Sequence, residues 1–169
     1  MKSVIPAFAA SAATVLLVGC TSLPSTLAVP GDERLLFRAV AEGTWSYHCR
    51  LSNDGQSLSW ALLQPDAVLR DPSGRDIGKL EAGPNFVHRD GSVAEGLVAA
   101  RVSEPPVALP MALYRASSAG NTGAMTPVRS VQQLNTRGGA QPSQGCTSGA
   151  DIMLEQRVPF AAEFRFFGR

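Results

Sequence analysis

Apolar and polar side chains alternate most clearly between residues 44 and 62. The apolar positions of the two arms are Trp45, Tyr47, Cys49, Leu51, Leu58, Trp60 and Leu62. A period of two is typical of a strand with one buried face. The polar segment 52–56 between the arms contains Asp54-Gly55, a pair that favours a tight reversal. This stretch therefore predicts a β-hairpin.

The rest of the chain is divided into short extended segments by glycine and proline. The segments expected to be extended are 35–41, 67–70, 77–81, 85–89, 92–102, 108–116, 128–136 and 158–167. Glu42-Gly43 and Pro65 are interpreted as breaks, and 138–149 as a long loop. No segment after residue 20 keeps a period of 3.6, which excludes a helical fold. We expect an all-β, single-domain sandwich or small closed barrel of about nine or ten short strands.

The first nineteen residues have another pattern, because 4–18 is almost wholly apolar after the positive Lys2. An apolar run of this length is typical of a secretory signal. The run ends in Leu17-Val18-Gly19-Cys20, which resembles the bacterial lipobox, whose cysteine is lipidated and becomes the first residue of the mature chain. The alternative is an ordinary cleaved signal with a chance cysteine.

These observations predict three parts of the chain. Residues 1–19 are expected to form a lipoprotein signal peptide, 20–32 a lipidated tether and 33–169 the β domain. Attached acyl chains such as palmitate would hold the protein to the membrane. Thr21 follows the cysteine in place of Asp, which by the usual sorting rule favours the outer membrane over the inner one, and we expect the protein at its periplasmic face. The expected location is the cell envelope.

The charge balance argues against nucleic acid as a partner. The full chain has fifteen Lys and Arg and fourteen Asp and Glu, and removal of Lys2 with the signal leaves fourteen of each. A chain near neutrality has no long-range field that would attract phosphate backbones. The partners expected are the membrane, through the lipid anchor, and an envelope protein or a small ligand.

Three cysteines, of which Cys20 is assigned to lipidation, leave Cys49 and Cys146 in an oxidising compartment. Two such cysteines are expected to form a disulfide. Free thiols and a metal pair are the alternatives, although neither cysteine has a second thiol or a histidine at a recognised zinc spacing. A bridge closing a loop of on the order of a hundred residues would stabilise the domain by roughly 4–5 kcal/mol in the chain-entropy model.

Candidate chemistry is sparse. The only histidines are His48, on the polar face of the hairpin, and His88, beside a predicted turn. Each is a candidate ligand-binding residue, and a solvated strand histidine is the alternative. Asn135 and Arg137 precede Gly138-Gly139, and an arginine held by glycine turns can bind a carboxylate or sulfate through two hydrogen bonds. A structural salt bridge is the alternative for Arg137. No catalytic residue, metal site or cofactor is predicted.

A set of short motifs runs through the mature domain. They are VPGDERLLFRAVAEG at 29–43, Tyr47-x-Cys49, Trp60-Ala61-Leu62, Pro65-Asp66-Ala67-x-Leu69-x-Asp71, Gly78, Ala82-Gly83-Pro84, Asp90-Gly91-Ser92 and Val131-Gln132-Gln133-Leu134-Asn135-Thr136-Arg137-Gly138-Gly139 ahead of Cys146. In order and spacing they resemble the domain-of-unknown-function 3455 family of secreted bacterial and fungal proteins, over residues 29–167. The resemblance implies a small exported protein with no settled activity, and its paired cysteines agree with the expected disulfide.

Two positions depart from the pattern of that family. Leu80 stands where a histidine is frequent, and Phe86 where a tryptophan is frequent. If that histidine serves a site in relatives, this chain lacks it. The favoured interpretation is a membrane-anchored envelope lipoprotein with a ligand-binding or structural β domain. An interaction module for another envelope protein and an enzyme of unrecognised type stay open.

Overall fold

The computed structural model describes residues 23–102 and 107–169. The predicted signal peptide and the predicted lipidation site Cys20 lie outside the described residues. The strands are β1 (Arg34–Leu51), β2 (Leu58–Arg70), β3 (Asp76–Glu81), β4 (Asn85–His88), β5 (Ser92–Val102), β6 (Met111–Gly120), β7 (Val128–Gly138) and β8 (Glu155–Gly168). Two short 3₁₀ turns, η1 (Ser25–Leu27) and η2 (Gly149–Asp151), complete the elements. None of the described helices is long and apolar enough to cross a membrane.

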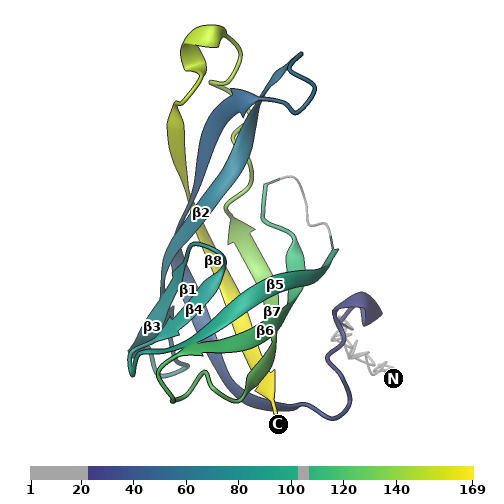
Figure 1. Cartoon of the computed structure of the whole chain (residues 1–169), viewed down its shortest axis with the longest axis vertical. Coiled ribbons are helices and arrows are strands. Elements are labelled where there is room, and N and C mark those ends of the chain that lie inside the picture. Colours follow the sequence, from purple (N-terminus) through teal and green to yellow (C-terminus); the bar gives the residue numbers. More distant parts are fainter. Residues whose placement is uncertain (1–22, 103–106) are drawn as a thin grey trace, which may run out of the picture.

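The strands form one closed antiparallel barrel in chain order (Figure 1). β1 closes the ring because it pairs with β2 on one side and with β8 on the other. The predicted all-β class is thus confirmed, and of its two forms the structure has the closed barrel.

The barrel has eight strands instead of about nine or ten. The difference arises because the predicted breaks at Glu42-Gly43 and Pro65 lie inside β1 and β2. At Gly43 an added Cβ would stand 2.1 Å from the carbonyl oxygen of Asp66, so the glycine permits close approach of two strands rather than ending one. β3 pairs with β2 only from Ala67, so β2 has no neighbour on that side at Pro65, a position that tolerates proline.

Three strands continue beyond the barrel and form an arm. β1 pairs with β2 as far as Leu51 opposite Leu58, and with β8 as far as His48 opposite Glu155. β3 leaves β2 at Ala67, and β7 leaves β8 at Phe160. The arm therefore consists of residues 45–51, 58–65 and 155–159, and it projects past the other strands in Figure 1.

The disulfide predicted between Cys49 and Cys146 is present, with the two Cα atoms 5.5 Å apart. It ties the arm to the segment that follows β7. Trp60 Nε1 donates a hydrogen bond of 2.9 Å to the carbonyl of Gln144 in the same segment. Most of the predicted 138–149 loop is confirmed, since β7 ends at Gly138 and η2 begins at Gly149, and Cys146 holds this segment against the arm.

Aromatic side chains fill the middle of the barrel. Phe86 packs edge-on against Tyr114, Phe164 and Phe166, with ring centroids 6.0, 5.2 and 5.3 Å away. Phe37 stacks on Phe166 at 4.4 Å. Because these rings block the interior, any hollow inside the barrel must lie at one of its ends.

The segment before β1 is packed against the outside of the barrel. Leu27 is fully buried in a small cluster with Leu113 and Leu134. Its carbonyl accepts a hydrogen bond of 2.7 Å from Gln132 Nε2. The predicted boundary between tether and domain at residue 33 stays a prediction, and part of the predicted tether lies on the barrel wall.

Replacing both disulfide cysteines, as Cys49→Ser together with Cys146→Ser, should lower the free energy of unfolding by about 2–5 kcal/mol. The reason is that the bridge spans 97 positions of the chain and restricts the unfolded state. Urea unfolding with and without reductant measures the effect. The reduced wild-type protein should match the double variant, whose own unfolding should not respond to reductant. Equal midpoints for the oxidised wild type and the variant would contradict the expectation.

Candidate ligand-binding site

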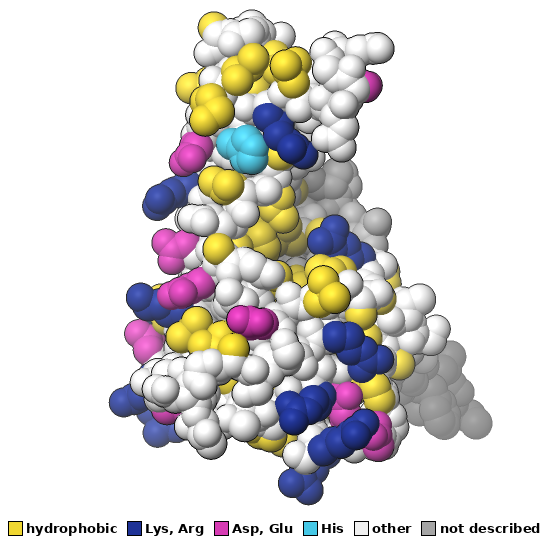
Figure 2. Space-filling view, viewed as in Figure 1, with side chains coloured by type: hydrophobic (Ala, Val, Ile, Leu, Met, Phe, Trp, Pro, Cys, Tyr) yellow, Lys and Arg dark blue, Asp and Glu magenta, His cyan; other side chains and the backbone are white. Residues whose placement is uncertain are grey.

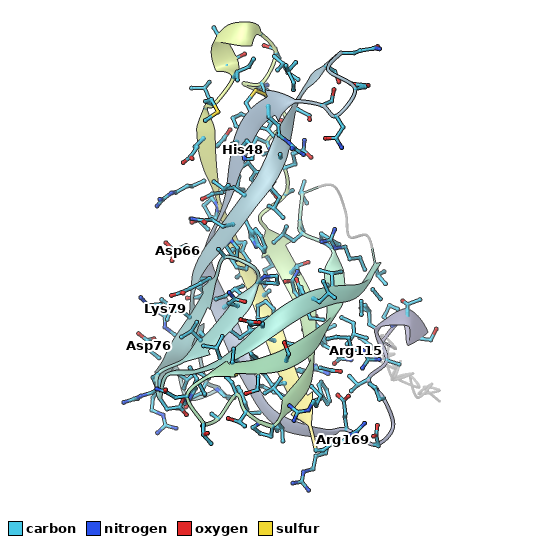
Figure 3. All side chains as sticks on the ribbon, viewed as in Figure 1. His48, Asp66, Asp76, Lys79, Arg115 and Arg169 are labelled. Atoms are coloured by element: carbon cyan, nitrogen blue, oxygen red, sulfur yellow. A yellow bond between two sulfur atoms is a disulfide. The ribbon has the colours of Figure 1, made fainter. Side chains whose placement is uncertain are left out.

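His48 lies on the outer face of the arm, opposite Ala61 and Glu155 (Figure 3). Its neighbours Tyr47 and Cys49 point inward and are buried, whereas His48 is half-buried. Nδ1 of His48 is buried and has no hydrogen-bond partner among the described residues. This histidine therefore faces away from the barrel interior.

His88 lies at the other end of the barrel. Its Nδ1 stands 2.9 Å from Oδ2 of Asp90. The hydroxyl of Ser92 and the backbone N–H groups of Ala124 and Ser92 hold the pKa of Asp90 well below its usual range. Strand pairing across the sheet places His88 at the level of Ala41 on β1. Ala41 is seven positions from His48, so the two levels are about 23 Å apart along β1. The structure does not bring the two histidines together.

Asn135 and Arg137 lie on the outer face of β7. Asn135 has a positive φ of 51° in an irregular part of the strand, and its Nδ2 donates a hydrogen bond of 2.8 Å to Glu163 Oε2. Arg137 is opposite Ala161, whose neighbours Phe160 and Ala162 fill the interior. Arg137 forms no ion pair within the described residues. Ligand binding by these two residues stays a prediction.

A hollow of about 310 Å³ lies where the arm leaves the barrel, and we call it the rim pocket. Its lining residues are Trp45, Tyr47, Leu62, Arg101, Ala108, Leu109, Pro110, Ala112, Tyr114, Gln133, Ala140 and Gln141. None of the four candidates from the sequence is among them. Figure 2 shows hydrophobic side chains in the hollow below the arm.

Unequal strand lengths produce the rim pocket. β3 and β4 have six and four residues, against eighteen in β1 and thirteen in β2. The barrel wall between β2 and β5 therefore ends early. Tyr114, in edge-on contact with Phe86 of the aromatic core, forms part of the pocket wall.

A β-bulge in β5 directs Arg101 into the pocket. Val98 is opposite Tyr114 and Ala100 is opposite Leu113, so Ala99 is an extra residue. Arg101 is consequently opposite the inward-facing Ala112 and lines the pocket. Uninterrupted alternation from Val98 would have placed this arginine on the outer face. Bulges commonly redirect a side chain at barrel rims and beside functional sites.

A second bulge, in β2, shapes the other wall. Ser46 is opposite Gln64 and Tyr47 is opposite Leu62, so Leu63 is the extra residue. Leu62 shares the inner face with Tyr47 and lines the pocket, and 44% of it is exposed. Leu63, almost equally exposed at 45%, does not line it.

Hydrogen bonds inside the pocket hold the loops around it. The Tyr47 hydroxyl donates to the carbonyl of Gly139 at 2.5 Å. The Tyr114 hydroxyl donates to Gln133 Oε1 at 3.0 Å, and Gln133 Nε2 donates to the carbonyl of Pro110 at 2.9 Å. These groups position both connecting segments, before β6 and after β7.

Two donors in the pocket have no partner among the described residues. Trp45 is 7% exposed, and its Nε1 is buried without a hydrogen bond. Arg101 takes part in none of the observed ion pairs or side-chain hydrogen bonds. No described residue supplies an acceptor for the indole N–H of Trp45 or an ion-pair partner for Arg101.

A second hollow of about 460 Å³ lies beside His88 at the opposite end of the barrel, and its wall includes Leu35, Phe37 and Ile77. Two of its polar wall residues are paired, because His88 meets Asp90 and Asp71 meets Arg75, whereas Arg38 takes part in none of the observed ion pairs. None of the buried polar atoms that lack a partner among the described residues belongs to the wall of this hollow. No group of three or more His, Cys, Asp or Glu in 23–102 and 107–169 is placed to hold a metal.

Sequence reasoning did not identify Arg101, Trp45 or Tyr114 as site residues. No pattern of charges in the strand distinguishes Arg101 from an ordinary surface arginine. The bulge at Ala99 contains no glycine, proline or other turn residue that would reveal it in the sequence. Trp45 was correctly assigned to the buried face of the hairpin. Alternation of apolar residues, however, does not show whether a buried indole N–H has a hydrogen-bond partner.

Burial raises the pKa of Tyr114 to about 12, and the nearby charge of Arg101 opposes the shift. Burial also raises the pKa of Tyr47 above its ordinary value of 10.0. Since the unfolded chain ionises both near 10, their contribution to stability is complete below about pH 10 and falls as the pH rises toward 12.

The chain has two tyrosines, so tyrosinate absorbance during an alkaline titration reports on both. At pH 10 the folded protein should be less ionised than the unfolded one, with Tyr114 largely protonated, whereas in concentrated urea both tyrosines should be half ionised near that pH. Tyr114→Phe should remove part of the alkaline loss in the free energy of unfolding. Identical titrations in buffer and in urea would contradict the burial argument.

Comparison with curated proteins finds no match, and no solved structure matches either. A family model does match, over residues 73–168, which covers most of the barrel from the turn before β3 to the end of β8. The matched part contains Arg101, Tyr114 and Cys146. The resemblance inferred from the sequence motifs is thereby confirmed, and the chain belongs to the family described as "Protein of unknown function (DUF3455)".

Proposed function

We propose that this protein is an envelope-anchored binding protein that holds a small apolar or aromatic molecule in the rim pocket. The rim pocket itself is the observation that carries this proposal. Its volume of about 310 Å³ is at the lower end of the range for small-molecule sites, about 300–1,000 Å³. Its walls are mainly aromatic and aliphatic, with a few polar groups, as such sites usually are.

The pocket is preformed, which supports binding further. Its wall strands belong to the closed barrel, and the segment after β7 is fixed by Cys146 and by the hydrogen bond from Tyr47 to Gly139. A rigid wall lowers the entropic cost of ordering side chains around a ligand. The exposed Leu62 gives an apolar edge at which a ligand can enter.

Binding is favoured over catalysis by the lining residues. Among the described ones there is no His, Cys, Ser, Asp or Glu, the residue types that most often act as nucleophile or general base. The alternative of an interaction module is supported by the end of the arm, where Leu51, Ile152, Met153 and Leu154 are 40–77% exposed. Nothing in the structure indicates what would cover these side chains.

The anchor proposed at Cys20 would keep the barrel close to the membrane. Seven positions separate Cys20 from Leu27, which corresponds to at most about 25 Å of extended chain. Leu27 is buried on the barrel wall, so the tether would not add further length after that point. A binding domain held in this way would act on molecules near the membrane surface.

Binding is tested by isothermal titration calorimetry with the neutral probe 3-phenylpropionamide. Leu62→Asp should weaken binding by about tenfold or more, because it replaces an apolar wall group with a carboxylate. Leu63→Asp is the matched control, since the neighbouring residue has the same type and similar exposure but lies outside the pocket. Absence of binding to the wild type, or equal losses in both variants, would refute the pocket as the binding site.

The anchor is tested separately in cells treated with globomycin, which blocks lipoprotein signal cleavage. The unprocessed precursor should accumulate on immunoblots, and Cys20→Ala should abolish both processing and acylation. Normal maturation under either condition would refute lipid attachment at this cysteine.

A further inference from the structure

We propose that the ligand of the rim pocket is a monocarboxylate with an apolar or aromatic body, whose carboxylate is bound by Arg101 and by the indole N–H of Trp45. This inference rests on the proposed function, because it assumes that the pocket holds a small molecule. It goes further by specifying the charge of the ligand and the two groups that recognise it.

Arg101 is directed toward the inner face of the barrel. The bulge at Ala99 places this side chain on the inner face, opposite Ala112 and beside Tyr114. The side chain is exposed and lines the pocket, whereas uninterrupted alternation would have placed it on the outer face of the barrel. A guanidinium binds a carboxylate through two parallel hydrogen bonds, which are stronger than neutral ones.

The indole N–H of Trp45 has no hydrogen-bond partner among the described residues. An indole N–H is a donor only, and a buried donor without an acceptor costs free energy. The lining residue Trp45 is almost fully buried, and its Nε1 has no partner. A ligand oxygen would satisfy it, whereas a hydrocarbon ligand would leave it unpaired.

The other polar groups of the pocket wall either bond within the protein or carry no charge. The hydroxyl protons of Tyr47 and Tyr114 and the amide of Gln133 are used within the protein. None of the described lining residues is acidic. Tyr114 is neutral at physiological pH, and burial, which raises its pKa to about 12, keeps it neutral at higher pH as well. The described part of the pocket wall therefore offers one positive charge and no negative charge, which favours a monoanion.

The aromatic wall specifies the rest of the molecule. Trp45, Tyr47 and Tyr114 contribute three ring systems to one small hollow, together with Leu62 and other aliphatic groups. Rings in such a wall pack against a flat or aliphatic body in offset or edge-on contacts. One arginine does not match a phosphate ester, which carries nearly twice the charge and is usually bound by several donors.

The experiment compares 3-phenylpropionate with 3-phenylpropionamide by calorimetry on the purified protein. The two probes have the same body and differ in charge. The wild type should bind the carboxylate about tenfold more tightly, which corresponds to one charge-assisted hydrogen bond. Arg101→Gln should remove that preference while leaving the affinity for the amide within about twofold. Retained amide binding shows that the variant is folded.

Arg137→Gln is the matched control, because it removes the same charge from the outer face of the barrel. It should change neither affinity. Trp45→Phe should lower the affinity for the carboxylate more than that for the amide. If both probes bind equally and Arg101→Gln has no effect, the charge inference is wrong while the pocket remains a binding site. Equal effects of Arg101→Gln and Arg137→Gln would also overturn it, and failure of both probes to bind would refute the proposed function as well.

Discussion

The double pairing of β1 is the constraint on which the rest of the structure depends. This strand contacts β8 from Arg34 to His48 and β2 from Val40 to Leu51. Closure by one strand removes the sheet edges along the lower barrel, where unpaired N–H and C=O groups would otherwise meet water or another chain. Closure also directs every second side chain of the eight strands into one shared interior. The aromatic cluster around Phe86 fills the middle of this interior.

The same strand explains why the protein has a hollow at one end. β1, β2 and β8 are longer than the strands between them, so the wall cannot keep the same height around the ring. On the side of β3 and β4 it stops early, and the arm stands beside the opening. The disulfide joins the arm to the segment after β7 at this place. The bridge that stabilises the domain therefore also holds the segment that forms part of the pocket wall. A loop of 138–149 that swung away would remove Ala140 and Gln141 from the pocket wall.

Alternation of apolar residues could predict the all-β class, the hairpin and the inward direction of Trp45, Tyr47 and Cys49, because each depends on a local period of two. Counting cysteines could predict the disulfide, since only two remained for pairing in an oxidising compartment. The strand number was overestimated because Gly43 and Pro65 look like breaks in isolation. Whether such a residue ends a strand depends on the neighbouring strand, and that contact is not local in sequence.

The site was missed for a related reason. A pattern of period two assigns a face to each residue only while the pairing stays regular, and the rim pocket lies where it does not. The extra residue Ala99 carries no mark in the sequence, yet it decides that Arg101 faces inward, whereas Leu62 keeps the inward face that alternation with Trp60 predicts. His48, which the sequence suggested, follows the regular alternation to the outer face, whereas the irregularity between Leu134 and Arg137 moves Arg137 to the outer face. Regular alternation from Val131 and Gln133 would have turned Arg137 inward. In this barrel the charge available to a ligand is therefore set by the positions of the bulges, because they bring Arg101 to the inner face and take Arg137 away from it.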